Sequence, residues 1–413
     1  MKYHIIIALL LASLVQVTLS AQTRRMNNVA TGRTFAAENP GRSVIPLLQE
    51  AERQFRALNY EGTFFTLENA VAQNPQSAEA LILRAKFKKM TGMQTEAEAD
   101  LRLANQINPM AADLYGYNGN AGILKLLSIE PEEAVTSLST FQKLNYYYQS
   151  IDRKITNGDL SEEESAVLLE VVEKIEGNNL YEALDDINTA LEDFPKSALA
   201  YDLKGVILKK QGKFEDALDA FNKAIELDPK FGIAWYNLGL MEQSLGNYEK
   251  AKEHLDRSIE LQKDLTKAYF DRAVLLKKMG KEKNALKDYN SVINEKGTSY
   301  MEAYLNRGLT RKMLGDYTGA LADLNRVIKE LPEDAELRKN RGNLHLLFGL
   351  NRKAIDDYTR AIELDGNYAE AYYNRALAFF LIYDKISGCA DLDSSIDLGY
   401  EKAVQTKSYF CTY

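Results

Sequence analysis

Residues 198–231 read ALAYDLKGVILKKQGKFEDALDAFNKAIELDPKF, and this 34-residue stretch recurs along the chain. Positions 4, 8, 15, 17 and 20 of the stretch hold Tyr201, Gly205, Gly212, Phe214 and Ala217. In two later copies the same positions hold Trp235, Gly239, Gly246, Tyr248 and Ala251, then Tyr304, Gly308, Gly315, Tyr317 and Ala320. A fixed period of this length indicates a stack of small units, each of which buries its apolar face on its neighbours.

The joint recurrence of aromatic, glycine and alanine residues at these positions resembles the tetratricopeptide repeat. The resemblance implies an all-α fold, a right-handed α-solenoid (superhelix) of about ten helix-turn-helix units with a C-terminal capping helix. Each unit would consist of a helix A and a helix B. The resemblance also implies a protein-interaction scaffold.

The regularity of the repeats predicts a division of the chain. Residues 44–153 form a divergent block of about three repeats, 154–163 a turn or junction, 164–402 a regular array of seven repeats, and 403–413 a C-terminal cap. In the junction, Asn157-Gly158 favours a turn, and Ser161 with Glu164 has the spacing of a capping box.

Residues 1–21 are typical of a secretory signal peptide, with Lys2 before an apolar run over residues 5–17 and small residues near the expected cut. An uncleaved membrane anchor is the alternative. A polar, flexible leader is expected over residues 22–43. We therefore expect export to the periplasm, or to the outside or surface of a bacterial cell. The formal net charge of −8 disfavours general nucleic-acid binding.

The two cysteines, Cys389 and Cys411, both lie near the C-terminal end of the sequence. In an exported protein, such a pair predicts a disulfide that would hold the last helix on the final repeat. Two free thiols in a reducing compartment are the alternative.

Oppositely charged residues recur 16 positions apart. Repeat positions 7 and 23 pair Arg84 with Asp100, Arg272 with Asp288, Arg307 with Asp323, Arg341 with Asp357, and Arg375 with Asp391. We interpret these as structural ion pairs between helices A and B of one repeat. A ladder of ligand-binding arginines is the alternative. Asp186 lacks this partner because Glu170 occupies position 7 of its repeat.

In the family that the chain resembles, helix A lines a concave groove that binds a partner. The resemblance assigns to this groove Tyr236, Leu240, Phe270, Val274, Leu305, Leu309, Lys339, Asn343, Tyr373, Asn374 and Leu377. A basic edge would comprise Lys209, Lys210, Lys277, Lys278 and Lys312. Such a groove suits a peptide with apolar anchors and acidic flanks. The alternatives are that the apolar side chains pack against adjacent helices and that the lysines are simply solvated.

Some family members grip a carboxylate at a partner's C-terminus with lysine, asparagine and arginine side chains. Lys339, Asn343 and Asn374 match part of that pattern, but Val404 and Ser408 stand where a further lysine and arginine are needed. The carboxylate clamp is therefore incomplete.

No catalytic, cofactor or metal motif is evident in the sequence, and His254 and His345 have none around them. We expect no enzyme and no cofactor. The leading hypothesis is a scaffold that binds a protein or peptide in its groove. The alternatives are a structural subunit or assembly factor of an envelope or secretion complex and, third, a regulatory module of an enzyme.

Overall fold

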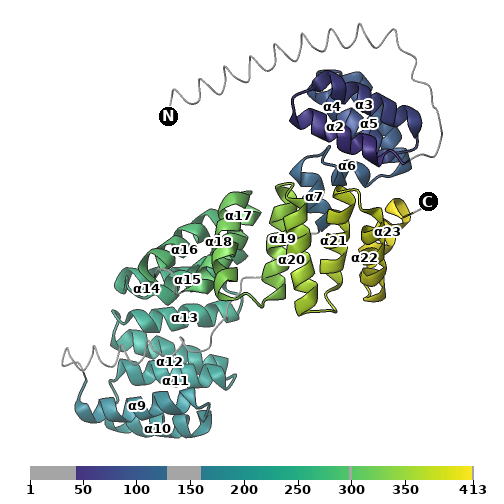
Figure 1. Ribbon diagram of the computed structural model, residues 1–413. Helices are drawn as coiled ribbons and strands as arrows, with labels where there is room; N and C mark the ends of the chain where they lie inside the picture. Colours follow the sequence, from purple (N-terminus) through teal and green to yellow (C-terminus); the bar gives the residue numbers. More distant parts are fainter. Residues whose placement is uncertain (1–42, 128–159, 297–299, 412–413) are drawn as a thin grey trace. The chain divides into compact units, whose positions relative to one another are not determined.

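The computed structural model describes residues 43–127, 160–296 and 300–411. The predicted signal peptide, all of the leader except Ser43, the end of the divergent block and most of the junction lie outside these ranges. Every regular element in the described residues is a helix. These helices form two compact units (Figure 1).

Unit 2 contains the helices between residues 160 and 331, arranged as antiparallel pairs. Its helices are α9 (Glu162–Glu176), α10 (Leu180–Asp193), α11 (Ala198–Lys210), α12 (Phe214–Leu227), α13 (Gly232–Ser244), α14 (Tyr248–Leu261), α15 (Thr266–Lys278), α16 (Glu282–Lys296), α17 (Met301–Met313) and α18 (Tyr317–Glu330). Each pair is one repeat, in which helix A precedes helix B.

Unit 1 combines the described N-terminal helices with the C-terminal ones. Its helices are α2 (Ile45–Arg56), α3 (Tyr60–Gln73), α4 (Ala78–Met90), α5 (Gln94–Ile107), α6 (Ala111–Leu114), α7 (Asn120–Leu127), α19 (Ala335–Leu347), α20 (Asn351–Leu364), α21 (Ala369–Leu381), α22 (Lys385–Asp397) and α23 (Glu401–Phe410). A boundary between the units after Leu331 falls inside the array that the sequence predicts as continuous.

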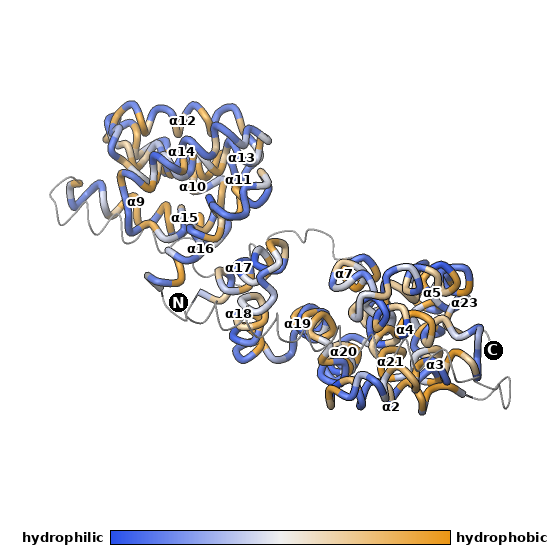
Figure 2. The backbone as a smooth tube through the Cα atoms, turned by 90° about the horizontal axis from the view of Figure 1, so that it is seen from above, coloured by the Kyte–Doolittle hydropathy of each residue, from blue (hydrophilic) through white to orange (hydrophobic). Residues whose placement is uncertain are grey.

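Small residues allow the two helices of a repeat to approach closely. A Cβ added to Gly205 would lie 2.5 Å from the ring of Phe221, and one added to Gly342 would lie 2.6 Å from the ring of Tyr358. Both aromatic rings are fully buried. Figure 2 shows hydrophobic and hydrophilic residues interleaved along the helices, as expected where each helix has one buried face.

Repeat position 15 adopts the left-handed conformation that ends helix A. Glycine occupies it in six repeats, with positive φ at Gly92, Gly212, Gly246, Gly280, Gly315 and Gly349. Leu58, Asn178 and Tyr383 hold the same position in three further repeats and are also the described non-glycine residues with positive φ. The geometry of the turn is therefore imposed by the repeat even where its residue is unfavourable.

Tyr383 also joins the N-terminal and C-terminal parts of unit 1. Its ring lies nearly parallel to that of Tyr115, with centroids 6.5 Å apart. Its hydroxyl donates a hydrogen bond to Glu52 Oε1 at 3.0 Å. A bulky residue in a left-handed conformation thus carries a long-range contact, which helps explain why glycine is absent there.

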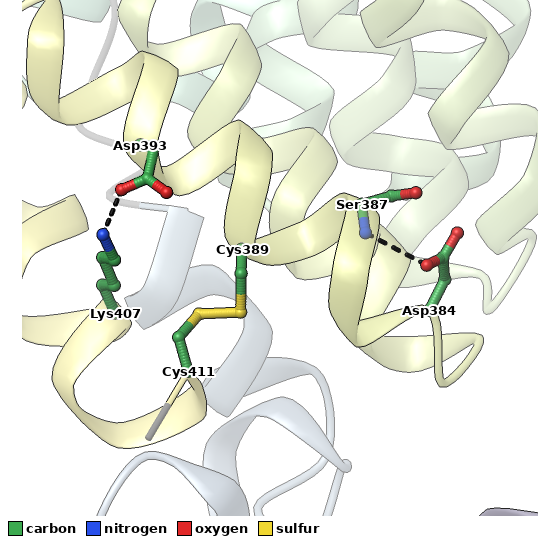
Figure 3. Close-up of a disulfide and its surroundings, with 6 residues drawn as sticks. All are labelled: Asp384, Ser387, Cys389, Asp393, Lys407 and Cys411. Carbon is green, nitrogen blue, oxygen red and sulfur yellow. Dashed lines mark hydrogen bonds and ion pairs between the residues drawn. A yellow bond between two sulfur atoms is a disulfide. The ribbon is translucent and has the colours of Figure 1, made fainter. Parts of the chain in front are cut away.

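The last helix is fixed at its C-terminal end by a disulfide between Cys389 of α22 and Cys411, with Cα atoms 5.8 Å apart (Figure 3). The Phe410 ring also stacks on that of Phe380 at 4.9 Å. Covalent and apolar contacts therefore hold α23 against the repeat that precedes it.

Reduction of this disulfide is expected to destabilise α23 by about 3 kcal/mol, because an open chain gains conformational freedom when α23 unfolds. Hydrogen exchange of residues 401–410 with and without dithiothreitol measures the effect. The double variant Cys389→Ser/Cys411→Ser should exchange like the reduced protein and not respond to dithiothreitol. Unchanged protection of α23 after reduction would show that apolar contacts alone hold it.

Candidate partner-binding groove

Five arginines on A helices each contact an aspartate on the B helix of the same repeat, in the pairs inferred from the sequence. The Nε and Nη2 atoms of Arg272 donate to the two oxygens of Asp288 at 2.8 and 2.7 Å. The same bidentate hydrogen bonding joins Arg84 to Asp100, Arg307 to Asp323, Arg341 to Asp357, and Arg375 to Asp391. All five aspartates are buried, so these arginines act within the fold.

The third nitrogen of four of these arginines reaches the B helix of the preceding repeat. Arg272 Nη1 donates to Asp256 at 2.7 Å, and Arg307 Nη1 donates to Asn290 at 2.7 Å. Arg84 and Arg375 make the equivalent contacts with Glu68 and Thr359. Each arginine therefore ties two consecutive repeats together. The sequence does contain a signal for this contact, a polar residue 16 or 17 positions before the arginine. The prediction of ion pairs within single repeats did not use it.

A second basic residue, at repeat position 11, contacts the aspartate in four repeats. Its contacts are Lys88 with Asp100, Lys174 with Asp186, Arg311 with Asp323, and His345 with Asp357. Asp186, which lacks an arginine partner, is thus paired with a lysine. His345 Nδ1 lies 3.0 Å from Asp357 Oδ2, a structural position for that histidine.

Two of these buried aspartates, Asp357 and Asp391, differ in acidity. At Asp357, burial alone would raise the pKa, but the neighbouring His345 and Arg341 hold the pKa below its usual value. At Asp391, burial outweighs the contact with Arg375 and raises the pKa. Ionised Asp357 therefore stabilises the fold above its unfolded-state pKa, and this contribution is lost as the pH falls through its folded-state pKa.

The eleven groove residues assigned by resemblance divide between the two units and are mostly buried. In unit 2, Tyr236 and Leu240 are half-buried, whereas Phe270, Val274, Leu305 and Leu309 are buried. Phe270 packs edge to face on Tyr289 and Tyr300, with centroids 5.9 and 5.3 Å away. The ring of Phe270 therefore belongs to the core of its repeat.

The five assigned residues of unit 1, Lys339, Asn343, Tyr373, Asn374 and Leu377, are buried as well. Asn343 Oδ1 accepts hydrogen bonds from the Tyr358 hydroxyl at 2.7 Å and from Asn374 Nδ2 at 3.1 Å. Lys339 Nζ lies 3.4 Å from Glu370 Oε2. The residues that match the carboxylate clamp thus bind other residues of the chain.

The lysines of the basic edge have different environments. Lys210 and Lys278 are exposed, Lys209 is half-buried, and Lys277 and Lys312 are buried. Burial lowers the pKa of Lys209, against the favourable charge of Asp271. These residues therefore do not form one uniformly solvated edge.

A smaller accessible set remains on the A helices of unit 2. After the groove that the resemblance assigns to the A helices, we call Val206 and Lys209 of α11, Tyr236 and Leu240 of α13, and Asp271 of α15 the central groove; all five are half-buried. The Tyr236 hydroxyl donates to Asp271 Oδ2 at 2.6 Å. Asp271 also contacts Lys267 of its own helix at 3.1 Å. The set combines aliphatic and aromatic surface with a desolvated cation.

The described residues contain no group of three or more histidine, cysteine, aspartate or glutamate side chains able to hold a metal ion. Of the helices in the described ranges, none is both long enough and apolar enough to cross a membrane.

Paired helices with a buried, repeated A–B contact define a helical repeat scaffold. The tetratricopeptide repeat family matches residues 198–231 and 232–265, and further models of such repeats match 302–334 and 349–382. The chain is a tetratricopeptide repeat protein. Repeats of this family are generally non-enzymatic scaffolds for protein–protein interaction. No curated protein matches the sequence.

Several crystal structures are similar over part of the chain. YrrB, described as a tetratricopeptide repeat protein with an unusual peptide-binding site, is 22% identical, with a TM-score of 0.43, over 46% of this chain and 99% of its own. A tetratricopeptide repeat protein from Parabacteroides merdae is 22% identical, with a TM-score of 0.40, over 61% of this chain and 100% of its own. The C-terminal part of a repeat protein from Cytophaga hutchinsonii is 14% identical, with a TM-score of 0.49, over 57% of this chain and 97% of its own.

Proposed function

We propose that the protein is an exported scaffold that binds a segment of a partner protein at the central groove of unit 2. The observation that carries this proposal is the half-buried apolar surface of Val206, Tyr236 and Leu240 on the neighbouring helices α11 and α13, together with the half-buried Lys209 of α11. Apolar side chains of a partner would cover Val206, Tyr236 and Leu240, and an acidic group of the partner would neutralise the charge of Lys209. Export is supported by the Cys389–Cys411 disulfide, which persists in oxidising compartments.

Leu240→Gln is expected to reduce partner capture about tenfold, the effect of losing about 1.4 kcal/mol of apolar contact. Chemical crosslinking of the intact protein in its native cells, followed by mass spectrometry, measures the yield of the partner. Leu218→Gln on α12 is the matched control, since Leu218 is also half-buried but lies on a B helix. Unchanged capture by the Leu240 variant, with thermal stability retained, would contradict the proposal.

A structural subunit of an envelope assembly is the second candidate. Three aromatic residues near the starts of B helices, Tyr181, Phe214 and Tyr248, are 84, 46 and 39% exposed. A permanent neighbour could cover such rings at the edge of the repeats. If Tyr181→Ser together with Phe214→Ser abolishes capture while Leu240→Gln does not, this second function is favoured.

A further inference from the structure

Glu164, in the first turn of α9, has a buried carboxylate oxygen without a partner. The residue is 9% exposed, and no described residue donates a hydrogen bond to its Oε1. The Ser161 hydroxyl accepts a hydrogen bond from the Glu164 backbone N–H at 3.1 Å, which caps the helix. Within the described residues, the carboxylate does not complete the capping box by accepting from Ser161 N–H.

Burial of a carboxylate oxygen without a hydrogen bond costs free energy, because no partner in the protein replaces the water molecules that the oxygen loses. Natural structures contain few such groups, and each calls for a specific explanation, such as an absent ligand. The group that would satisfy Glu164 must be a hydrogen-bond donor, and a cation would satisfy its charge as well.

Glu164 lines a cavity of about 440 Å³ within unit 2. Apolar side chains form part of the cavity wall, and polar residues form the rest. The apolar residues include Leu160, Phe194, Pro195, Leu199 and Leu227, and Lys196, Ser197 and Asp228 line the cavity beside Glu164. Glu162 and Glu163 are exposed on the same helical turn as Glu164 and add negative charge to this end of α9. A long apolar stem that ends in a cation fits this combination of walls and charge.

We propose that this cavity binds a lysine or arginine side chain of a partner protein. The aliphatic stem would lie against the apolar walls, and the ammonium or guanidinium group would donate a hydrogen bond to Glu164 Oε1. The site is separate from the central groove, so the two can be tested independently.

Lys196 is the competing cation on the chain itself. It lines the same cavity and is exposed. A bound partner cation would be repelled by Lys196. Removal of its charge should therefore strengthen binding of a basic peptide.

Calorimetric titration of the full chain with three peptides tests the proposal. The peptides are acetyl-Gly-Leu-X-Leu-Gly-amide, with X as arginine, lysine or citrulline, which keeps the shape of arginine without its charge. The arginine and lysine peptides should bind, and whichever binds more tightly identifies the preferred cation. Citrulline in the peptide, or Glu164→Gln in the protein, should each weaken binding about tenfold or more, the loss expected from one charged hydrogen bond.

Glu163→Gln is the matched control, because it removes the same charge from an exposed neighbour on the same turn. It should leave binding nearly unchanged, and Lys196→Ala should tighten it. Equal binding by wild type and Glu164→Gln would overturn the proposal. So would a lower melting temperature of unliganded Glu164→Gln, because the carboxylate would then serve the fold of the free chain.

Discussion

Asp323→Ala is expected to lower the local stability of the α17–α18 repeat by about 3–5 kcal/mol, the cost of leaving a buried charge without its partner. Asp323 is 3% exposed. Its oxygens accept hydrogen bonds from Arg307 Nε at 3.0 Å, Arg307 Nη2 at 2.7 Å and Arg311 Nη1 at 2.8 Å. The alanine variant therefore leaves the guanidinium groups of Arg307 and Arg311 without their shared carboxylate in a largely buried position.

Hydrogen exchange of α17 and α18 measures this effect repeat by repeat, because stability in a repeat array is a sum of local terms. Asp219→Ala, at an exposed position of α12, is the control and should change stability by less than about 0.5 kcal/mol. Arg307→Met with Asp323→Leu should recover part of the loss, since removing both charges leaves fewer unpaired groups. A loss below about 1 kcal/mol for Asp323→Ala would show that the pair behaves like an exposed ion pair.

Phe270→Ala is expected to destabilise the α15–α16 repeat by about 3–5 kcal/mol, because it leaves a cavity in a closely packed core. Phe270 is fully buried and packs with Tyr289, Tyr300 and Val292. Hydrogen exchange of α15 and α16 provides the measurement. Phe214→Ala, where the ring is 46% exposed, is the matched control and should have a much smaller effect.

The same variant distinguishes the two interpretations of Phe270. If its ring were a groove residue that contacts a partner, Phe270→Ala would cost little stability and would reduce partner capture directly. The packing on Tyr289 and Tyr300 predicts the opposite result, in which the main effect of Phe270→Ala is a loss of stability.

The helix pairs and their internal ion pairs could be predicted because both depend on one repeat. Arg272 and Asp288 are 16 residues apart in a single hairpin, so their meeting follows from the repeat itself. The contact between Arg272 and Asp256 depends on how consecutive hairpins stack. The only sign of this stacking in the sequence is a polar residue 16 positions before the arginine. That residue belongs to the preceding repeat, so the pattern of a single repeat does not include both partners.

Burial of the A helices could not be predicted position by position. The steps of three and four residues place Phe270 and Val274 on one helical face. Whether that face is open depends on neighbouring repeats, and here Tyr300, which follows helix B, covers Phe270. The contact of Tyr383 with Glu52 joins residues 331 positions apart, and no periodic signal marks it.

The proposed function depends on the binding of a partner at the central groove of unit 2. Site-specific photo-crosslinking in native cells tests it most directly, with a photoreactive amino acid at Leu240 and, in a separate strain, at Glu226, an exposed residue of α12. We expect a discrete partner adduct from position 240 that weakens when Lys209→Gln is added, and no such adduct from position 226. An adduct from position 226 alone would contradict binding at the central groove.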